Sequence, residues 1–159
     1  MVIKSTIFNS KIGCLHIVSE DDFLIQIKIN PAQDIISQES KFNNRVIIQL
    51  KEYFLGNLTL FSVPIKFLEK SDFKKKIWNE MLKIPYGGIS SYKSISENIG
   101  HPKAYRAVGT AIGQNPIPII IPCHRVLNSN GGIGGFSAGL DIKKKLLKIE
   151  QMDGLKKNC

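Results

Sequence analysis

Alternating apolar and polar residues near the start of the chain predict three short β-strands. The alternation runs through residues 2–8, 14–18 and 23–29, and an acidic turn at residues 20–22 separates the second strand from the third. Strands joined by such short connections pair in antiparallel order. We therefore expect a small antiparallel meander.

A four-residue spacing of apolar side chains then replaces the alternation. It predicts an amphipathic helix that ends at Gly56 and has an apolar face made of Phe42, Val46, Leu50 and Phe54. Residues 60–67 are expected to form a final edge strand, because Pro64 has no N–H to donate to a neighbour. The pattern predicts an α/β domain over residues 1–70.

The pattern changes at Ser71, a good N-cap residue, and the remainder of the chain is predicted to be mostly helical. One helix begins there, with an apolar face made of Phe73, Ile77, Met81 and Ile84. The chain ends in another helix over residues 141–152. We predict a second domain over residues 71–159.

Two short helices lie between these. The first, over residues 94–99, stops at Gly100, and the second begins at Pro102 and runs to Gly113. Two helices joined by a glycine turn match the plan of a helix-turn-helix. Much of the second helix is alanine and glycine, so its surface can approach another backbone closely.

An apolar run in the second half ends in reactive side chains. Residues 119–121 are all isoleucine, and Pro122, Cys123, His124 and Arg125 come next. A proline favours extended geometry in the preceding residue, so we expect a buried strand with Cys123 at its end. Cysteine is a strong nucleophile as its thiolate, although many cysteines are only small buried apolar residues.

Length and cysteine content narrow the class of protein. The chain has 159 residues, 43% of them apolar, which suits one compact domain or two small ones. Cys14, Cys123 and Cys159 are odd in number and widely spaced, which argues for a reducing compartment and against zinc. No apolar segment approaches the roughly 18 residues of a membrane span. We expect a protein without a metal or cofactor that is cytoplasmic, or nuclear if its cell has a nucleus.

The positive charge lies almost wholly in the second half. Residues 1–70 carry 8 Lys/Arg and 7 Asp/Glu, whereas residues 71–159 carry 14 and 6. Lysines of that half, including Lys143, Lys144 and Lys145, can pair with phosphates, so nucleic acid is the expected partner. A lysine-rich solvated surface is the alternative.

A series of motifs resembles the O6-alkylguanine-DNA alkyltransferases in order and spacing. The motifs are Pro85-Tyr86-Gly87, Ser90-Ser91-Tyr92, Gly100-His101-Pro102-Lys103-Ala104, Arg106-Ala107-Val108-Gly109, Asn115-Pro116, Pro122-Cys123-His124-Arg125-Val126, the glycine-rich run 131–139, and Glu150. The resemblance is dense over residues 71–150, while the first half matches only in size and α/β character. It implies a ribonuclease-H-like N-terminal domain that supports a winged helix-turn-helix domain carrying the active site.

The resemblance implies direct reversal of DNA damage. Cys123 would take the alkyl group, such as a methyl, from O6 of a guanine flipped out of the duplex, irreversibly and once per protein molecule. His124 would act as the base through a water, and Glu150 would orient His124. Asn115 would hold the turn before the active-site strand. Whether O4-alkylthymine is a second substrate stays open.

The resemblance also implies contacts with the base and with DNA. Tyr92 and the backbone amide of Ser137 would donate to the flipped base, while carbonyls of Cys123 and Val126 would accept from its exocyclic amine. Arg106 would fill the vacated space in the duplex. A monomer would bind the minor groove of double-stranded DNA, and the other residues at this surface would be Ser91, Ala104, Ala107 and Phe136. Phe136 and Ala138 stand where family members often have tyrosine and glycine, which bears on substrate range.

Three other interpretations compete with this one. A non-enzymatic relative that marks damage would lack the cysteine, so Cys123 argues against it. A cysteine hydrolase would pair Cys123 with His124, yet adjacent residues in extended geometry point to opposite faces. A plain winged-helix regulator would not need the cysteine at all.

Overall fold

The computed structural model describes residues 1–157, with side chains for residues 1–151, so Cys159 lies outside the described residues. The chain divides into two compact units, a first unit Met1–Leu68 and a second unit Glu69–Cys159. The division falls two residues before the boundary expected from the sequence.

The first unit contains a three-stranded antiparallel sheet in the order β1 (Ile3–Ser10), β2 (Gly13–Glu20) and β3 (Phe23–Ile29). The acidic turn between β2 and β3 places Asp21 at φ 52°, a conformation that Asp tolerates better than most residues. A bulge interrupts the pairing of β2 with β3 at Val18/Ser19. The predicted meander is confirmed.

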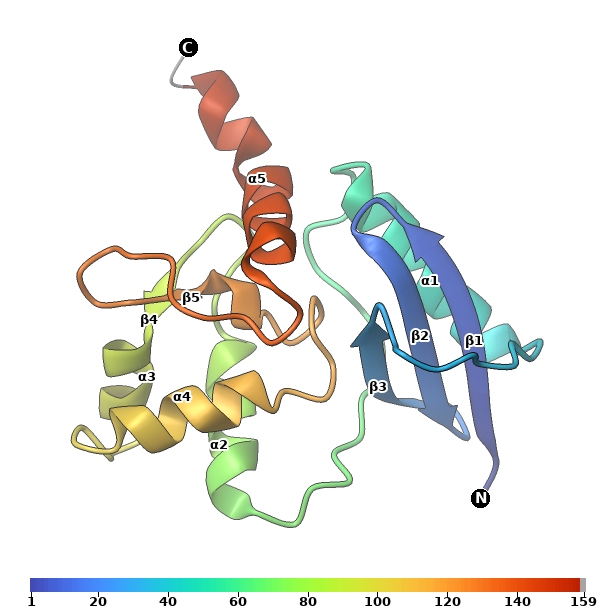
Figure 1. Cartoon of the computed structure of the whole chain (residues 1–159), viewed down its shortest axis with the longest axis horizontal. Helices are drawn as coiled ribbons and strands as arrows, with labels where there is room; N and C mark the ends of the chain where they lie inside the picture. Colours follow the sequence, from blue (N-terminus) through green and yellow to red (C-terminus); the bar gives the residue numbers. More distant parts are fainter. Residues whose placement is uncertain (158–159) are drawn as a thin grey trace. The chain divides into compact units, whose positions relative to one another are not determined.

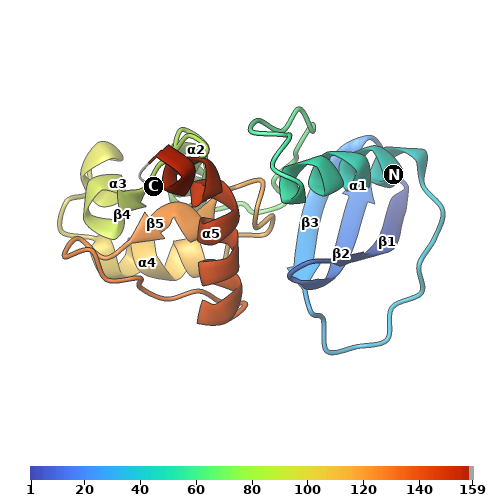
Figure 2. The ribbon, with the colours of Figure 1, turned by 90° about the horizontal axis from the view of Figure 1, so that it is seen from above.

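Helix α1 (Lys41–Phe54) lies across one face of this sheet (Figures 1 and 2). Ser40 caps it by accepting a hydrogen bond from the Asn43 amide. The alternate residues of the strands and the four-residue stripe of the helix meet in a core that includes Leu15, Ile17, Val46 and Leu50. The helix expected from the apolar spacing is therefore present.

Residues 60–67 do not form the expected edge strand. Only one bridge is present, in which Leu24 N donates to Pro64 O at 2.8 Å and Lys66 N donates to Leu24 O at 3.0 Å. Since Pro64 cannot donate, the ladder is not extended beyond this bridge.

The second unit is mostly helical, with α2 (Asp72–Met81), α3 (Tyr92–Asn98), α4 (Tyr105–Gly113) and α5 (Leu140–Lys157) (Figure 1). Trp78 on α2 is buried, and its Nε1 donates to Ala111 O on α4 at 2.9 Å. This bond and the surrounding apolar side chains join α2 to α4.

Several helix boundaries differ from those expected, and α3 begins at Tyr92 and not at residue 94. Helix α2 ends at Met81, and Ile84 is buried in the turn after it. Helix α4 begins at Tyr105 because Pro102 belongs to a preceding turn, which Ala104 N closes by donating to His101 O at 2.9 Å. Helix α5 continues past residue 152 to Lys157.

A two-stranded parallel sheet joins distant parts of the second unit. Strand β4 (Ser90–Ser91) pairs with β5 (Val126–Leu127) so that Ser90 lies opposite Val126. The start of α3 comes directly after β4, and Cys123 lies three residues before β5. The pairing therefore brings Tyr92 into the neighbourhood of Cys123.

Candidate active site

Cys123 is the first residue of a short 3-10 helix, η1 (Cys123–Arg125). It does not lie at the end of a strand, as the sequence had led us to expect. The expected strand over residues 119–121 is wrong. Ile119 has φ 77°, in the left-handed region that β-branched residues rarely adopt, and Ile121 N donates to Ile117 O at 2.9 Å. The chain turns back on itself here, and its isoleucines are buried as core residues.

The Asn115 side chain holds this turn at both ends. Its Nδ2 donates to Ile121 O at 2.8 Å, and its Oδ1 accepts from Ile117 N at 2.9 Å. A further hydrogen bond from Asn115 acts to lower the pKa of the Cys123 thiol. One amide thus fixes the turn that places the sulfur.

His124 and Glu150 form a buried pair between η1 and α5. His124 Nε2 is hydrogen-bonded to Glu150 Oε2, and the two side chains are 0% and 1% exposed. The other ring nitrogen, Nδ1, is buried and has no hydrogen-bond partner among the described residues. The pairing fixes the plane of the imidazole and leaves Nδ1 available for another partner.

Arg125 shares the same carboxylate. Its Nε donates to Glu150 Oε1 at 2.7 Å and its Nη2 to Oε2 at 3.1 Å, while its Nη1 donates to Ile84 O at 2.6 Å. Gly87 N also donates to Oε1, at 3.3 Å. A buried carboxylate needs such compensation, so Glu150 is held as an anion by several donors.

Burial sets the protonation states of the two adjacent residues. It raises the pKa of the Cys123 thiol to about 11, although Asn115 and the charge of Lys143 act to lower it. Burial also lowers the pKa of His124, against the opposing effect of Glu150. At neutral pH the pair is therefore a thiol beside a neutral imidazole, which can accept a proton.

Cys123 lines a cavity of about 180 Å³. The other lining residues come from α3, α4 and the loop after β5, and they are Tyr92, Gly109, Ile112, Gly113, Gly135, Phe136 and Ser137. Tyr92 Oη donates to Gly135 O at 3.4 Å. A larger groove of about 660 Å³ shares Tyr92, Gly109 and Gly135 with the cavity. Of the residues expected at the base, the structure brings Tyr92, Phe136 and Ser137 together around the sulfur.

Of the residues expected to contact DNA, Phe136 lines the cavity and the others lie outside its lining. Arg106 and Ala107 are exposed on α4, and Ala104 is its N-cap. Ser91 caps α3, with its Oγ accepting from Ser94 N at 3.0 Å. Val126 is buried at the start of β5.

Two residues of the site were not predicted from the sequence. Arg125 had no expected role beyond its place in a motif, yet it binds Glu150. Lys143 was expected to face phosphates but is buried, with its Nζ donating to backbone carbonyls. The signal for Lys143 was its helical spacing from Leu146 and Glu150, which places all three on the buried face of α5.

Among the described side chains, no group of three or more His, Cys, Asp or Glu could hold a metal ion. None of the described helices combines the length and the apolar character of a membrane span.

Comparisons with known proteins agree with this geometry. The family model described as the DNA-binding domain of 6-O-methylguanine DNA methyltransferase matches residues 72–152. A methylated-DNA–protein-cysteine methyltransferase of Methanosarcina acetivorans is 40% identical over 150 residues, which cover 91% of this chain and 96% of that protein. The chain therefore belongs to the 6-O-methylguanine DNA methyltransferase family.

Solved structures extend the likeness to both units. The O6-methylguanine methyltransferase of Mycobacterium tuberculosis has a TM-score of 0.86 and 34% identity, covering 95% of this chain and 94% of that one. The M. tuberculosis protein OGT, solved in complex with DNA, has a TM-score of 0.84 and 36% identity, with coverages of 94% and 93%.

Proposed function

We propose that this protein repairs O6-alkylguanine in DNA by transferring the alkyl group to Cys123. The sulfur attacks the alkyl carbon, so that the S–C bond forms while the C–O6 bond breaks. The thiol proton passes to His124, and the guanine leaves with its oxygen stabilised by hydrogen-bond donors. The thioether is stable, so each molecule reacts once.

The observation that carries this proposal is that Cys123, His124 and Glu150 are buried together, with Cys123 beside a cavity. A thiol with its pKa near 11 is a poor nucleophile at neutral pH and needs a base. His124 is neutral and presents Nδ1, while Nε2 is held by Glu150. A water between Nδ1 and the sulfur would complete the relay, and the imidazolium that forms would lie against the Glu150 carboxylate.

The cavity suits a guanine taken out of the duplex. We assign Tyr92 Oη and the Ser137 amide as donors to the leaving base, and the carbonyls of Cys123 and Val126 as acceptors for its exocyclic amine. Phe136 forms an apolar part of the same lining. A base inside a duplex cannot reach a buried sulfur, so flipping is part of the mechanism.

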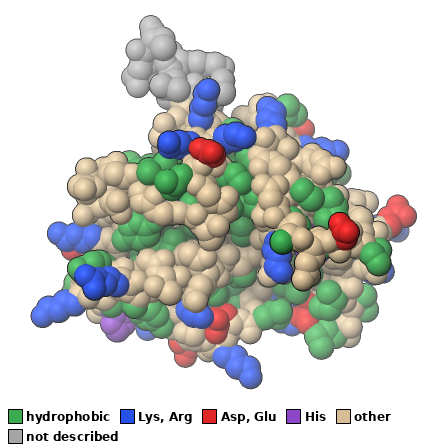
Figure 3. Space-filling model, viewed as in Figure 1, with side chains coloured by type: hydrophobic (Ala, Val, Ile, Leu, Met, Phe, Trp, Pro, Cys, Tyr) green, Lys and Arg blue, Asp and Glu red, His purple; other side chains and the backbone are tan. Residues whose placement is uncertain are grey.

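For DNA we infer that α3 and α4 act as the helix-turn-helix of a winged domain. The small residues Ala104 and Ala107 would lie in the minor groove, and Arg106 would enter the space left by the base. Lys and Arg side chains project from the surface in Figure 3, as binding to phosphates requires. We infer that a monomer suffices, with the first unit as a ribonuclease-H-like support. The odd number and wide spacing of the cysteines favour activity in the cytoplasm.

The test is mass spectrometry of the intact protein and its peptides after mixing with one equivalent of duplex containing O6-methylguanine. We expect one methyl group on the peptide that carries Cys123, guanine restored in the DNA, and no turnover beyond one equivalent. Cys123→Ser is the matched control and should bind the duplex without acquiring a methyl group. Tight binding by unmodified wild-type protein would instead define a module that only recognises damage.

A further inference from the structure

A lysine side chain is buried beside the candidate active site. Lys143 on α5 is 0% exposed, whereas Lys144 and Lys145, the next residues of the helix, are exposed. Removing an ammonium group from water is costly unless its three donors find acceptors. The acceptors therefore indicate what the lysine holds.

All the hydrogen bonds described for Lys143 go to backbone carbonyls. Its Nζ donates to Val126 O at 2.7 Å, to Ile133 O at 2.6 Å and to Gly135 O at 3.0 Å. Val126 belongs to β5, and the other two belong to the glycine-rich loop. One cation thus ties the start of β5 to two points of a loop that has few side chains of its own to fix it.

One of these three residues borders the cavity. Gly135 lines it together with Cys123, and Gly135 O also accepts from Tyr92 Oη. Under the proposed function, Val126 O accepts from the exocyclic amine of guanine. A carbonyl oxygen has two lone pairs, so Val126 O can take one bond from Lys143 and one from the base. The positive charge of Lys143 also lowers the pKa of Cys123.

Stability alone gives a weak reason for this arrangement. A buried ammonium has a desolvation cost that its hydrogen bonds offset only in part, so burying it adds little to the stability of the fold. No described carboxylate forms an ion pair with Lys143. A role at the candidate active site explains the buried cation better than a role in the stability of the core does.

We propose that Lys143 is a positioning residue for alkyl transfer. Its ammonium holds the Val126 carbonyl in place to accept from the exocyclic amine of guanine and ties it to the Ile133 and Gly135 carbonyls of the loop beside the cavity, and its charge stabilises the Cys123 thiolate. This inference rests on the proposed function. It assigns two measurable properties to one side chain, selectivity for the exocyclic amine and reactivity of the sulfur.

Selectivity is tested with two duplexes, one carrying O6-methylguanine and the other O6-methylhypoxanthine, which lacks the exocyclic amine. Single-turnover rates of methyl transfer are compared for wild type, Lys143→Met and Lys143→Arg, with thermal unfolding as a check of folding. We expect Lys143→Met to lose roughly ten- to a hundredfold in rate on the guanine lesion. The preference for guanine over hypoxanthine should fall toward one, because Val126 O is no longer held.

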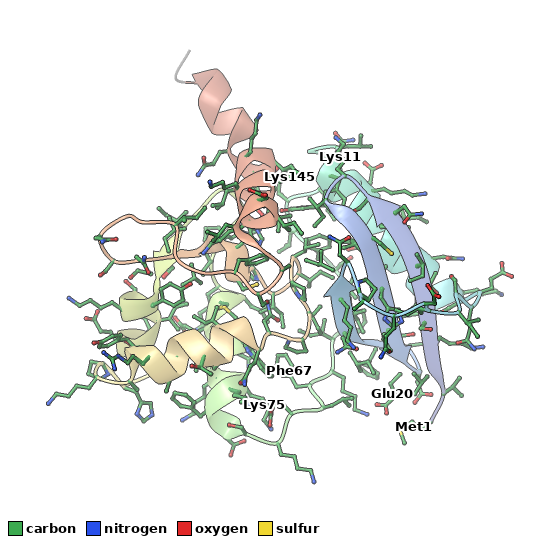
Figure 4. The ribbon with its side chains drawn as sticks, viewed as in Figure 1. Met1, Lys11, Glu20, Phe67, Lys75 and Lys145 are labelled. Atoms are coloured by element: carbon green, nitrogen blue, oxygen red, sulfur yellow. The ribbon has the colours of Figure 1, made fainter. Side chains whose placement is uncertain are left out.

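Reactivity is tested without DNA, from the pH dependence of Cys123 alkylation by iodoacetamide below about pH 8, where the Lys143 ammonium still carries its charge, in a Cys14→Ser, Cys159→Ser background. His124 and Tyr92 are the other titratable groups around the sulfur, and both are kept. We expect the profile of Lys143→Met to move to higher pH. Lys145→Met removes an exposed charge from the same helix (Figure 4) and should leave this profile in place, while weakening DNA binding.

Lys143→Arg separates the two properties, since it keeps the charge but cannot converge three donors on one point. Lys143→Arg should keep the pH profile of Cys123 alkylation and lose the preference for guanine over hypoxanthine. This variant therefore also tests the proposal if Lys143→Met fails to fold. Unchanged base preference in the folded variants would overturn the proposal, as would an unchanged thiol profile in folded Lys143→Met. If the wild-type protein shows the expected pH profile of Cys123 alkylation but accepts no methyl group from DNA, the proposed function is refuted instead.

Discussion

The two units bury polar groups of different kinds. In the core of the first unit these are mainly neutral, as with Thr6 and Asn43, whose Nδ2 donates to Thr6 Oγ1 at 3.0 Å. In the second unit the buried His124, Arg125, Lys143 and Glu150 are ionisable and are concentrated around one sulfur. Ionisable groups cost much more to bury than amides and hydroxyls. Perturbed ionisable groups cluster at functional sites, so the contrast supports placing the candidate active site in the second unit.

Removing Glu150 should break the second unit most severely. Glu150→Ala leaves His124 and Arg125 without their shared carboxylate, and loss of one partner of a buried ion pair costs about 3–5 kcal/mol. Urea unfolding followed by circular dichroism measures this loss. Methyl transfer should fall as well, because His124 loses its orientation.

The matched control is an exposed pair in the same unit. Asp72 is 90% exposed and lies 3.4 Å from Lys75 Nζ, so Asp72→Ala should cost less than about 1 kcal/mol. Equal losses for the two variants would contradict the special cost assigned to the buried site.

The titration of Cys123 should make the stability of the protein depend on pH. Burial raises the pKa of this thiol from 9.0 to about 11, so the folded protein holds the proton more tightly than the unfolded chain. The stabilisation is complete below about pH 9 and is lost as pH rises to about 11, by about 2–3 kcal/mol.

Cys123→Ser isolates this effect because serine does not titrate there. The free energy of unfolding of wild type minus that of the variant should fall across this interval, measured by urea unfolding at several pH values. Lys143, whose pKa is lowered by burial to about 8, acts in the opposite direction but is present in both proteins. A difference that stays constant with pH would show that the thiol is not desolvated.

The same contrast explains how far the sequence could predict the structure. The strands and α1 were predictable because alternation and four-residue spacing decide which side chains meet in an apolar core. The turn at Ile119 was not, since an apolar run fits a buried turn as well as a buried strand, and Asn115 closes that turn through hydrogen bonds that leave no periodic trace. Lys143 was misplaced because its three carbonyl partners lie 8 to 17 residues away along the chain.

The neutral polar core of the first unit should be less sensitive than the ionic site. Asn43→Ala removes the hydrogen bond to Thr6, whose hydroxyl still donates to Gln38 O, at a cost of about 0.5–1.5 kcal/mol in the free energy of unfolding. Asn44→Ala, at the next and exposed position of α1, should change it by less than about 0.5 kcal/mol. Methyl transfer by folded Asn43→Ala should match wild type, and a selective loss of transfer would give the first unit a part in catalysis.

The last comparison is between two arginines of the second unit. Arg106 is exposed, whereas Arg125 is buried. Arg106→Ala should leave stability unchanged and slow repair of duplex lesions by roughly tenfold or more, since a flipped base then leaves an unfilled space. Reaction with free O6-methylguanine base needs no flipping and should be retained. The ratio of the two rates, each measured by methylation of Cys123, is therefore the quantity to compare. An equal decrease on both substrates would mean that Arg106 acts on the cavity and has no part in extracting the base from the duplex.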